Sequence, residues 1–136
     1  MADGPEKKIE NKIKEDLESA GAYYIKNFAS ELSGKGHPDI TAVFGGKLRG
    51  KLLAIEVKKP IGGKPSPIQV ERLALIAKNG GRAVITAEPH TFQYLLGNLD
   101  VPVQKIKIKD LPKDLSDYPK IWTTRPKGCQ IVELIK

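Results

Sequence analysis

Two short segments carry acidic and basic side chains that could together act on a phosphate ester. The first is Gly36-His37-Pro38-Asp39 and the second is Ile55-Glu56-Val57-Lys58, with Glu56 seventeen residues after Asp39. Carboxylates are hard oxygen ligands that suit Mg²⁺ or Mn²⁺, and a backbone carbonyl such as that of Val57 can add a further ligand. A lysine beside the metal can activate a water or stabilise charge on phosphorus. These residue types predict metal-assisted hydrolysis of a phosphodiester.

Two strands must bring these segments together. Residues 39–44 and 52–57 are apolar and rich in β-formers, and Gly45-Gly46 begins a turn between them. If the two strands form an antiparallel hairpin, Asp39 lies near Glu56 at one end of the sheet. Glu56 and Lys58 are two residues apart on one strand, so their side chains point to the same face.

Helices and strands alternate in the first hundred residues. An apolar stripe at helical spacing runs from Ile9 to Ala20, after a helix start at residues 3–6 and before a stop at Gly21. We expect further strands over residues 22–28 and 82–86 and a short helix over residues 88–96. Another helix, the second in chain order, begins at Ser66. Its expected buried residues are Ile68, Leu73, Ala74 and Ala77. The order α, β, β, β, α, β, α predicts an α/β fold with a central mixed sheet flanked by helices.

The pattern of apolar and polar residues changes after Gly97. Residues 103–109 alternate apolar and basic side chains, which predicts a half-exposed strand, and residues 131–135 are a candidate final strand. We therefore expect a domain over residues 1–97. Residues 98–136 form a β-containing C-terminal extension that packs on the same domain or at a dimer interface.

Size and composition exclude several classes of protein. The chain has 136 residues, 40% hydrophobic and 29% charged, which is ordinary for one globular domain and argues against a disordered or fibrous chain. No apolar run suggests a membrane span, and the N-terminus does not look like a secretory signal. The lone Cys129 excludes an intramolecular disulfide and a cysteine-based zinc cluster. We expect a cytoplasmic protein, in a bacterial or phage-infected cell.

The charge is uneven and favours a polyanionic partner. The formal net charge is +7, and residues 35–64 carry seven bases and two acids, a net +5. Such a basic field attracts nucleic acid, although a solvated basic surface would have the same composition.

The motifs together resemble the PD-(D/E)XK nuclease superfamily, with Pro38-Asp39 and Glu56-Val57-Lys58 as its two halves. Within it the chain is most similar to the VRR-NUC branch, the virus-type replication-repair nuclease domain. The resemblance extends from about Glu6 to Thr86. The other matching residues are Glu6-Lys7-Lys8-Ile9-Glu10-Asn11, Gly21-Ala22, Lys26, Gly36-His37, Leu53-Ala54-Ile55, Ser66-Pro67-Ile68-Gln69 and Gly81. Residues 45–51 depart from the family because their hairpin loop is longer and more basic.

The resemblance implies roles for individual residues. Asp39 and Glu56 would bind Mg²⁺ or Mn²⁺, with the carbonyl of Val57, and Lys58 would serve the attacking water. Gln69 would lie at the start of the helix behind the site. A glutamate of the first helix, Glu6 or Glu10, would complete the acidic cluster. Five residues that flank the motifs could contact the DNA backbone: Lys26, Lys35, His37, Lys59 and Lys64.

Several of these residues also have simpler interpretations. Gln69 fits a capping box with Ser66, and Glu6 fits one with Asp3. Glu10 could be a solvent-facing helix charge, but the capping interpretation of Glu6 favours Glu10 as the site residue. Each lysine taken singly is more often solvated.

The resemblance implies a Mg²⁺-dependent endonuclease, a hydrolase for four-way (Holliday) junctions or other branched DNA in repair or recombination. Such substrates have two scissile strands, so we expect a homodimer. The alternatives are a restriction-type or nicking nuclease on duplex DNA and a non-cleaving DNA-binding module of the same fold.

Overall fold

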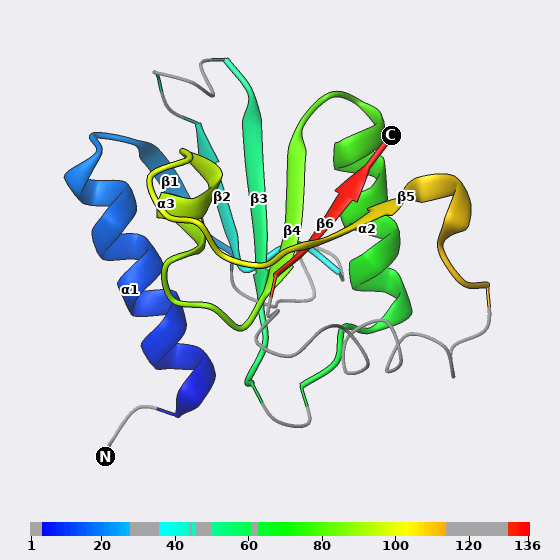
Figure 1. Ribbon diagram of the computed structural model, residues 1–136, viewed down its shortest axis with the longest axis horizontal. Coiled ribbons are helices and arrows are strands. Elements are labelled where there is room, and N and C mark those ends of the chain that lie inside the picture. The colour runs from blue at the N-terminus through cyan, green and yellow to red at the C-terminus, as the bar shows by residue number, and fades with distance from the viewer. Residues whose placement is uncertain (1–3, 28–35, 44, 46–49, 61–62, 114–130) are drawn as a thin grey trace.

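The structure is a computed structural model that describes residues 4–27, 36–43, 45, 50–60, 63–113 and 131–136. One mixed six-stranded sheet forms its centre, in the spatial order β1-β2-β3-β4-β6-β5 (Figure 1). The strands are β1 (Tyr23–Lys26), β2 (Ile40–Val43), β3 (Leu52–Val57), β4 (Arg82–Thr86), β5 (Gln104–Lys107) and β6 (Ile131–Ile135). The strands predicted from sequence are all present, and the α/β fold class is confirmed.

The predicted hairpin is also present. β2 and β3 pair antiparallel, with Ile40 opposite Ile55 and Val43 opposite Leu52. β3 then pairs parallel with β4, which places β3 in the interior of the sheet. Five of the six residues of β3 are buried, as expected for a strand covered on both faces.

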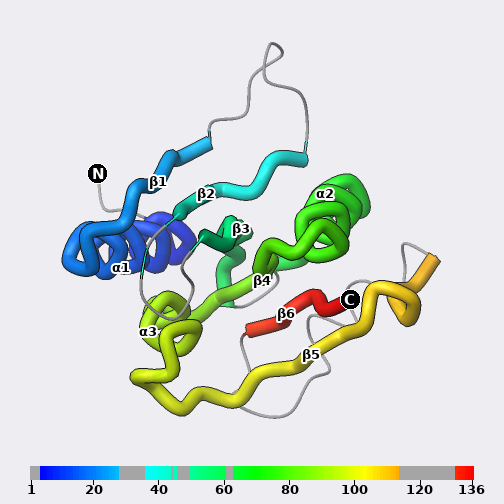
Figure 2. Tube along the Cα trace, turned by 90° about the horizontal axis from the view of Figure 1, so that it is seen from above, coloured from blue at the N-terminus to red at the C-terminus, as the bar shows by residue number. Residues whose placement is uncertain are grey.

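Helices cover both faces of the sheet. Figure 2 shows α1 (Pro5–Ser19) and α3 (Thr91–Leu95) on one side and α2 (Pro67–Lys78) on the other. A 3₁₀ helix, η2 (Ile108–Asp110), follows β5. No helix in the described ranges is long and apolar enough to cross a membrane.

The start of α1 differs from the prediction. Its N-cap is Gly4, which has no side chain to accept a backbone hydrogen bond, so the predicted capping box with Glu6 is wrong. Asp3, the predicted cap, lies outside the described residues. At the other end Gly21 stops the helix with a φ of 73°, a conformation that glycine adopts readily.

The start of α2 agrees with the prediction. Ser66 is the N-cap, and its hydroxyl accepts a hydrogen bond from the Gln69 backbone N–H while the Gln69 side chain bonds back to the Ser66 N–H. The predicted buried side is partly wrong, because Ile68 is 37% exposed and Val70 takes the buried position instead. A helix begun at Pro67 turns residues 70, 73 and 77 toward the sheet.

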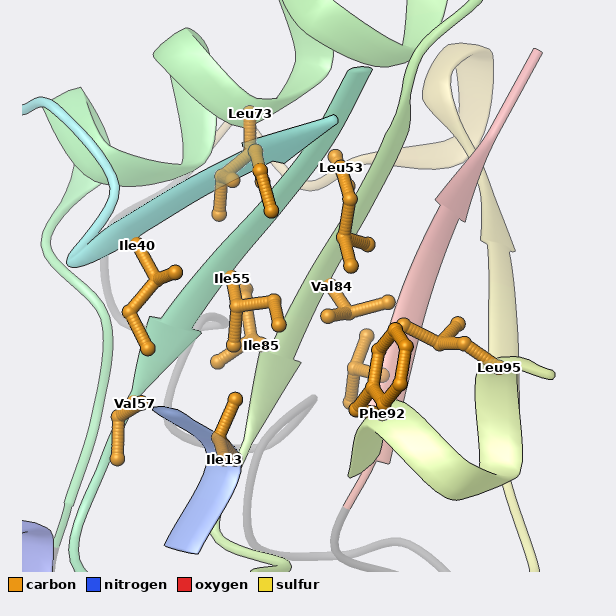
Figure 3. Close-up of a cluster of buried hydrophobic side chains, with 14 of the residues drawn as sticks. Ile13, Ile40, Leu53, Ile55, Val57, Leu73, Val84, Ile85, Phe92 and Leu95 are labelled. Carbon is orange, nitrogen blue, oxygen red and sulfur yellow. The ribbon is translucent and has the colours of Figure 1, made fainter. Parts of the chain in front are cut away.

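The core joins the sheet to the helices on both faces. Figure 3 shows Ile55 and Val84 on neighbouring strands with Ile13 of α1 and Phe92 of α3 nearby, and Leu73 of α2 in the same cluster. All five side chains are fully buried. Truncating one of the large aliphatic residues to alanine would cost about 2–5 kcal/mol.

The C-terminal segment widens the same sheet. β6 pairs antiparallel with β4 and parallel with β5, so β6 lies between them. Ile131, Val132 and Leu134 are buried. The division of the chain near residue 97 stays a prediction, and β6 is an integral part of the described sheet.

Candidate active site

The hairpin places Asp39 against the end of β3. Asp39 immediately precedes β2, and the backbone N–H of Val57 donates a hydrogen bond of 2.7 Å to its Oδ2 atom. The side chain of Asn27 helps to hold the segment around Asp39, because its Nδ2 atom donates to the carbonyl of Pro38 and to the Thr41 hydroxyl. Backbone pairing and these side-chain bonds thus fix the carboxylate at one end of the sheet.

Glu56 lies beside Asp39 in a buried position on β3. Glu56 is only 1% exposed, and its Oε2 atom has no hydrogen-bond partner in the part of the chain that the structure describes. The Oε1 atom accepts a 2.7 Å hydrogen bond from Gln69 Nε2 and lies 3.2 Å from Lys58 Nζ. Burial, with a further contribution from the neighbouring Asp39 charge, raises the pKa of Glu56 to about 8.

The capping box of α2 orients Gln69 toward Glu56. The Gln69 Oε1 atom accepts from the Ser66 backbone N–H at 2.8 Å, which turns the Nε2 end of the same amide toward the carboxylate. The capping box predicted for Gln69 is therefore confirmed, and the same side chain contacts Glu56. The N-terminus of α2 and the end of β3 are tied together through this one side chain.

A third acidic residue, Glu10, is surrounded by lysines. Glu10 is 4% exposed on the buried side of α1. Lys26 Nζ is in close contact with its Oε1 atom, while Lys7 and Lys14 lie 3.0 Å and 3.7 Å from Oε2. Burial alone would raise the pKa of Glu10, but the lysine ammonium groups outweigh burial and lower it, so Glu10 is ionised.

Lys26 connects this group to the strand carboxylates. Its ammonium lies 3.5 Å from Asp39 Oδ1 as well as against Glu10. A pocket of about 260 Å³ opens at this point, and the residues that line it are Glu6, Lys7, Glu10, Lys26, Asp39 and Val57. The pocket therefore joins the first helix to the end of the hairpin.

A comparison with solved structures finds a chain described as a "VRR_NUC domain". The match covers 72% of this chain and 100% of that one, with a TM-score of 0.58 and 23% sequence identity. The chain has the fold of a VRR_NUC domain. A scan against family models and a search of curated proteins each find no match.

The resemblance of the motifs implies a divalent metal ion, and two residues at the site have the chemistry to hold one. Asp39 and Glu56 are adjacent carboxylates, and Glu56 has a buried oxygen to which no described residue bonds. Mg²⁺ typically takes one or two carboxylates together with waters and substrate phosphate oxygens, so this pair is sufficient. Within the described ranges no group of three or more His, Cys, Asp or Glu side chains is placed to hold a metal. Lys26 lies between Glu10 and Asp39.

The VRR_NUC fold brings only some of the predicted site residues together. Asp39, Glu56, Lys58 and Gln69 meet at the end of β3, and Glu10 reaches them through Lys26. Glu6 is exposed at the pocket rim.

The residues predicted to contact DNA have different surroundings. His37, Lys59 and Lys64 are exposed, whereas Lys26 is engaged by two carboxylates. Lys35 lies outside the described residues. The site roles of all these residues stay predictions.

Three residues near the site were missed in the sequence. Lys7 and Lys14 pair with Glu10 at spacings of three and four, a helical pattern that could have indicated them. Asn27 carried no such signal, because its partners are distant in sequence: Pro38 precedes β2 and Thr41 lies in β2.

Proposed function

We propose that this protein is a divalent-metal-dependent nuclease that hydrolyses phosphodiester bonds in DNA. One observation carries the proposal: Glu56 is buried beside Asp39, and one of its oxygens has no hydrogen-bond partner among the described residues. Such an oxygen costs free energy unless a proton or a cation satisfies it. A protein that used β3 only as structure would gain stability from an apolar residue at this position.

Asp39, Glu56 and the carbonyl of Val57 would hold Mg²⁺ or Mn²⁺. Glu10 would be the first-helix carboxylate of the acidic cluster and would remain paired with Lys26 rather than bind the metal. A divalent ion bound there supplies Lewis acidity toward phosphate and lowers the pKa of a bound water. The Val57 N–H holds Asp39 in place and Gln69 holds Glu56. Lys58, whose ammonium lies beside Glu56, can orient the attacking water or stabilise charge on the phosphate.

The substrate class follows from the resemblance of the motifs and from charge. The net charge of +7 suits a phosphate backbone, and exposed His37, Lys59 and Lys64 flank the motif segments. We propose branched DNA, with four-way junctions first, cut by a homodimer that presents two sites to two strands. A nicking or restriction-type nuclease on duplex DNA is the alternative within the same chemistry.

The test is cleavage of labelled DNA in Mn²⁺ or Mg²⁺. Duplex, flap, splayed-arm and four-way junction substrates of equal length would be compared and the cuts mapped. Asp39→Asn and Glu56→Gln should each lower the rate by roughly 10²-fold or more, since each removes a metal-binding charge. Glu71→Gln is the matched control, because Glu71 is an exposed carboxylate of the same helix as Gln69.

Two outcomes would overturn the nuclease assignment. One is full cleavage in excess chelator, and the other is cleavage by Glu56→Gln at the rate of the Glu71→Gln control. A folded protein that binds DNA in Mn²⁺ but cuts none of the four substrates would support the non-cleaving DNA-binding module instead.

A further inference from the structure

Lys26 lies between carboxylates from two different elements. As a residue of β1 it pairs with Ile40 of β2, and its contact with Glu10 of α1 places its side chain on the face of the sheet that α1 covers. Its ammonium contacts Glu10 Oε1 and lies 3.5 Å from Asp39 Oδ1. The side chain is only 21% exposed, so solvent screens these charges weakly.

Glu10 would keep cationic partners without Lys26. Lys7 lies 3.0 Å and Lys14 3.7 Å from its Oε2 atom. Asp39 has a different set of neighbours: its Oδ2 atom accepts the Val57 N–H, and the Lys26 ammonium faces its Oδ1 atom. Loss of the Lys26 charge should therefore affect Asp39 more than Glu10.

Resting on the proposed metal-dependent function, we propose that Lys26 is the resident counter-ion of Asp39, competes with the divalent cation for that carboxylate, and so sets the affinity of the site for metal. In the metal-free protein the ammonium offsets repulsion between Asp39 and the neighbouring carboxylates. When a cation binds Asp39, Lys26 gives up this contact and stays paired with Glu10.

The geometry fits this exchange. Lysine is a compact point charge on a flexible stem, so it can leave one oxygen while it keeps another. A positive charge within 3.5 Å of a ligand oxygen opposes the arrival of a dication, since both charges act on the same carboxylate. The simpler role for Lys26 is structural: its ion pair with Glu10 would link α1 to β1 and would not change the affinity for metal.

Titration of the full-length protein with Mn²⁺ in the absence of DNA separates the two roles. The affinity would be measured by calorimetry and by the electron paramagnetic resonance of free Mn²⁺. Lys26→Met should tighten Mn²⁺ binding about tenfold, because it removes a competing charge beside the ligand. Lys14→Met is the matched control: Lys14 has similar exposure and pairs with the same Glu10, and no ion pair between Lys14 and Asp39 is found among the described residues. It should change the affinity by less than about twofold.

Unchanged or weaker Mn²⁺ binding in Lys26→Met would overturn the proposal in favour of a structural ion pair. Equal tightening in Lys14→Met would overturn it in favour of a general effect of net charge. Lys26→Gln can still bond to Glu10, so it carries the same expectation if Lys26→Met does not fold. Lys26→Arg keeps the charge and should bind Mn²⁺ with the affinity of the wild-type protein.

The wild-type protein and Asp39→Asn distinguish this inference from the proposed function. If wild-type protein binds Mn²⁺ through Asp39 and cuts DNA while Lys26→Met has unchanged affinity, only the role of Lys26 fails. If wild-type protein neither binds Mn²⁺ nor cuts DNA, the proposed function fails and this inference fails with it.

Discussion

Glu56 is the residue whose surroundings most restrict the chemistry of the site. It is buried on an otherwise apolar strand, next to Asp39, and one of its oxygens has no hydrogen-bond partner within the described ranges. A proton can satisfy that oxygen in the absence of metal, which is the physical meaning of a pKa of about 8. Metal binding and proton release at Glu56 are therefore expected to be coupled.

This coupling predicts how stability depends on pH in the presence of a chelator. Between the usual pKa of 4.5 and the folded-state value of about 8, the folded protein retains a proton that the unfolded chain releases. The free energy of unfolding therefore falls as pH rises through this range. We expect the melting temperature to drop by several degrees from pH 5 to pH 8, since each kcal/mol corresponds to roughly 4 °C for a chain of this size.

Glu56→Gln is the control for that measurement, because glutamine does not titrate. The variant should lose most of the decline in melting temperature between pH 5 and pH 8. If wild type and variant give parallel profiles, Glu56 is not the group responsible and its folded-state pKa is not raised.

The two first-helix glutamates should behave differently on mutation. Glu10 is buried among three lysines, whereas Glu6 is exposed and has no capping role. Glu10→Gln should lower turnover sharply and also cost about 1–3 kcal/mol, because it removes the charge that the lysines surround. Glu6→Gln should change stability by less than about 0.5 kcal/mol. Cleavage rates and urea unfolding of both variants would check this, and a larger loss of turnover in Glu6→Gln would reassign the role.

At the scale of elements, the start of α2 has both a structural and a positioning role. Gln69 closes the capping box with Ser66 and donates to Glu56. Gly36 lets the chain before Asp39 approach this helix, because a Cβ atom there would lie 2.9 Å from Ile68 and the φ of Gly36 is 82°. The helix start and the motif segments are therefore packed as one unit.

Two substitutions separate the roles of Gln69. Gln69→Glu keeps an oxygen that can accept the Ser66 N–H, but it loses the donor to Glu56 and adds a like charge there. It should lower turnover about tenfold or more and weaken Mn²⁺ binding little or not at all. Ser66→Ala removes the hydroxyl cap and should cost about 1 kcal/mol of stability with a smaller effect on rate. Loss of stability without loss of rate in Gln69→Glu would leave Gln69 with the capping role alone.

At the scale of the whole molecule, the sheet combines the two parts of the chain. The β2–β3 hairpin positions Asp39 and Glu56 of the proposed site, and β6 and β5 continue the sheet beyond β4. Arg82 of β4 and Glu133 of β6 form a partly buried ion pair of 2.6 Å across the junction. Removing the C-terminal strands would therefore expose the flank of β4 as well as shorten the chain.

The proposed paired cuts in a junction require two active sites. Because one chain holds one Asp39–Glu56 pair, we expect sedimentation at micromolar concentration to report about twice 14.9 kDa. The same dimer should bind a four-way junction as one complex. A monomer both free and on junction DNA would exclude paired cuts and leave a nicking or flap-directed nuclease that uses the same residues.

The sequence by itself determined the local parts of this protein. The motif residues, the antiparallel hairpin, the capping box of α2 and the bounds of β3, β4 and β6 all depend on neighbours close in the chain, so periodicity and turn residues reveal them. The packing of α1 on the sheet decided the rest. Only that packing buries Glu10 and sets it against Lys26, and the pairing of β1 with β2 places Lys26 beside Asp39. Tertiary structure also inserted β6 between β4 and β5, since the pairing of strands distant in sequence depends on how their apolar faces are buried together.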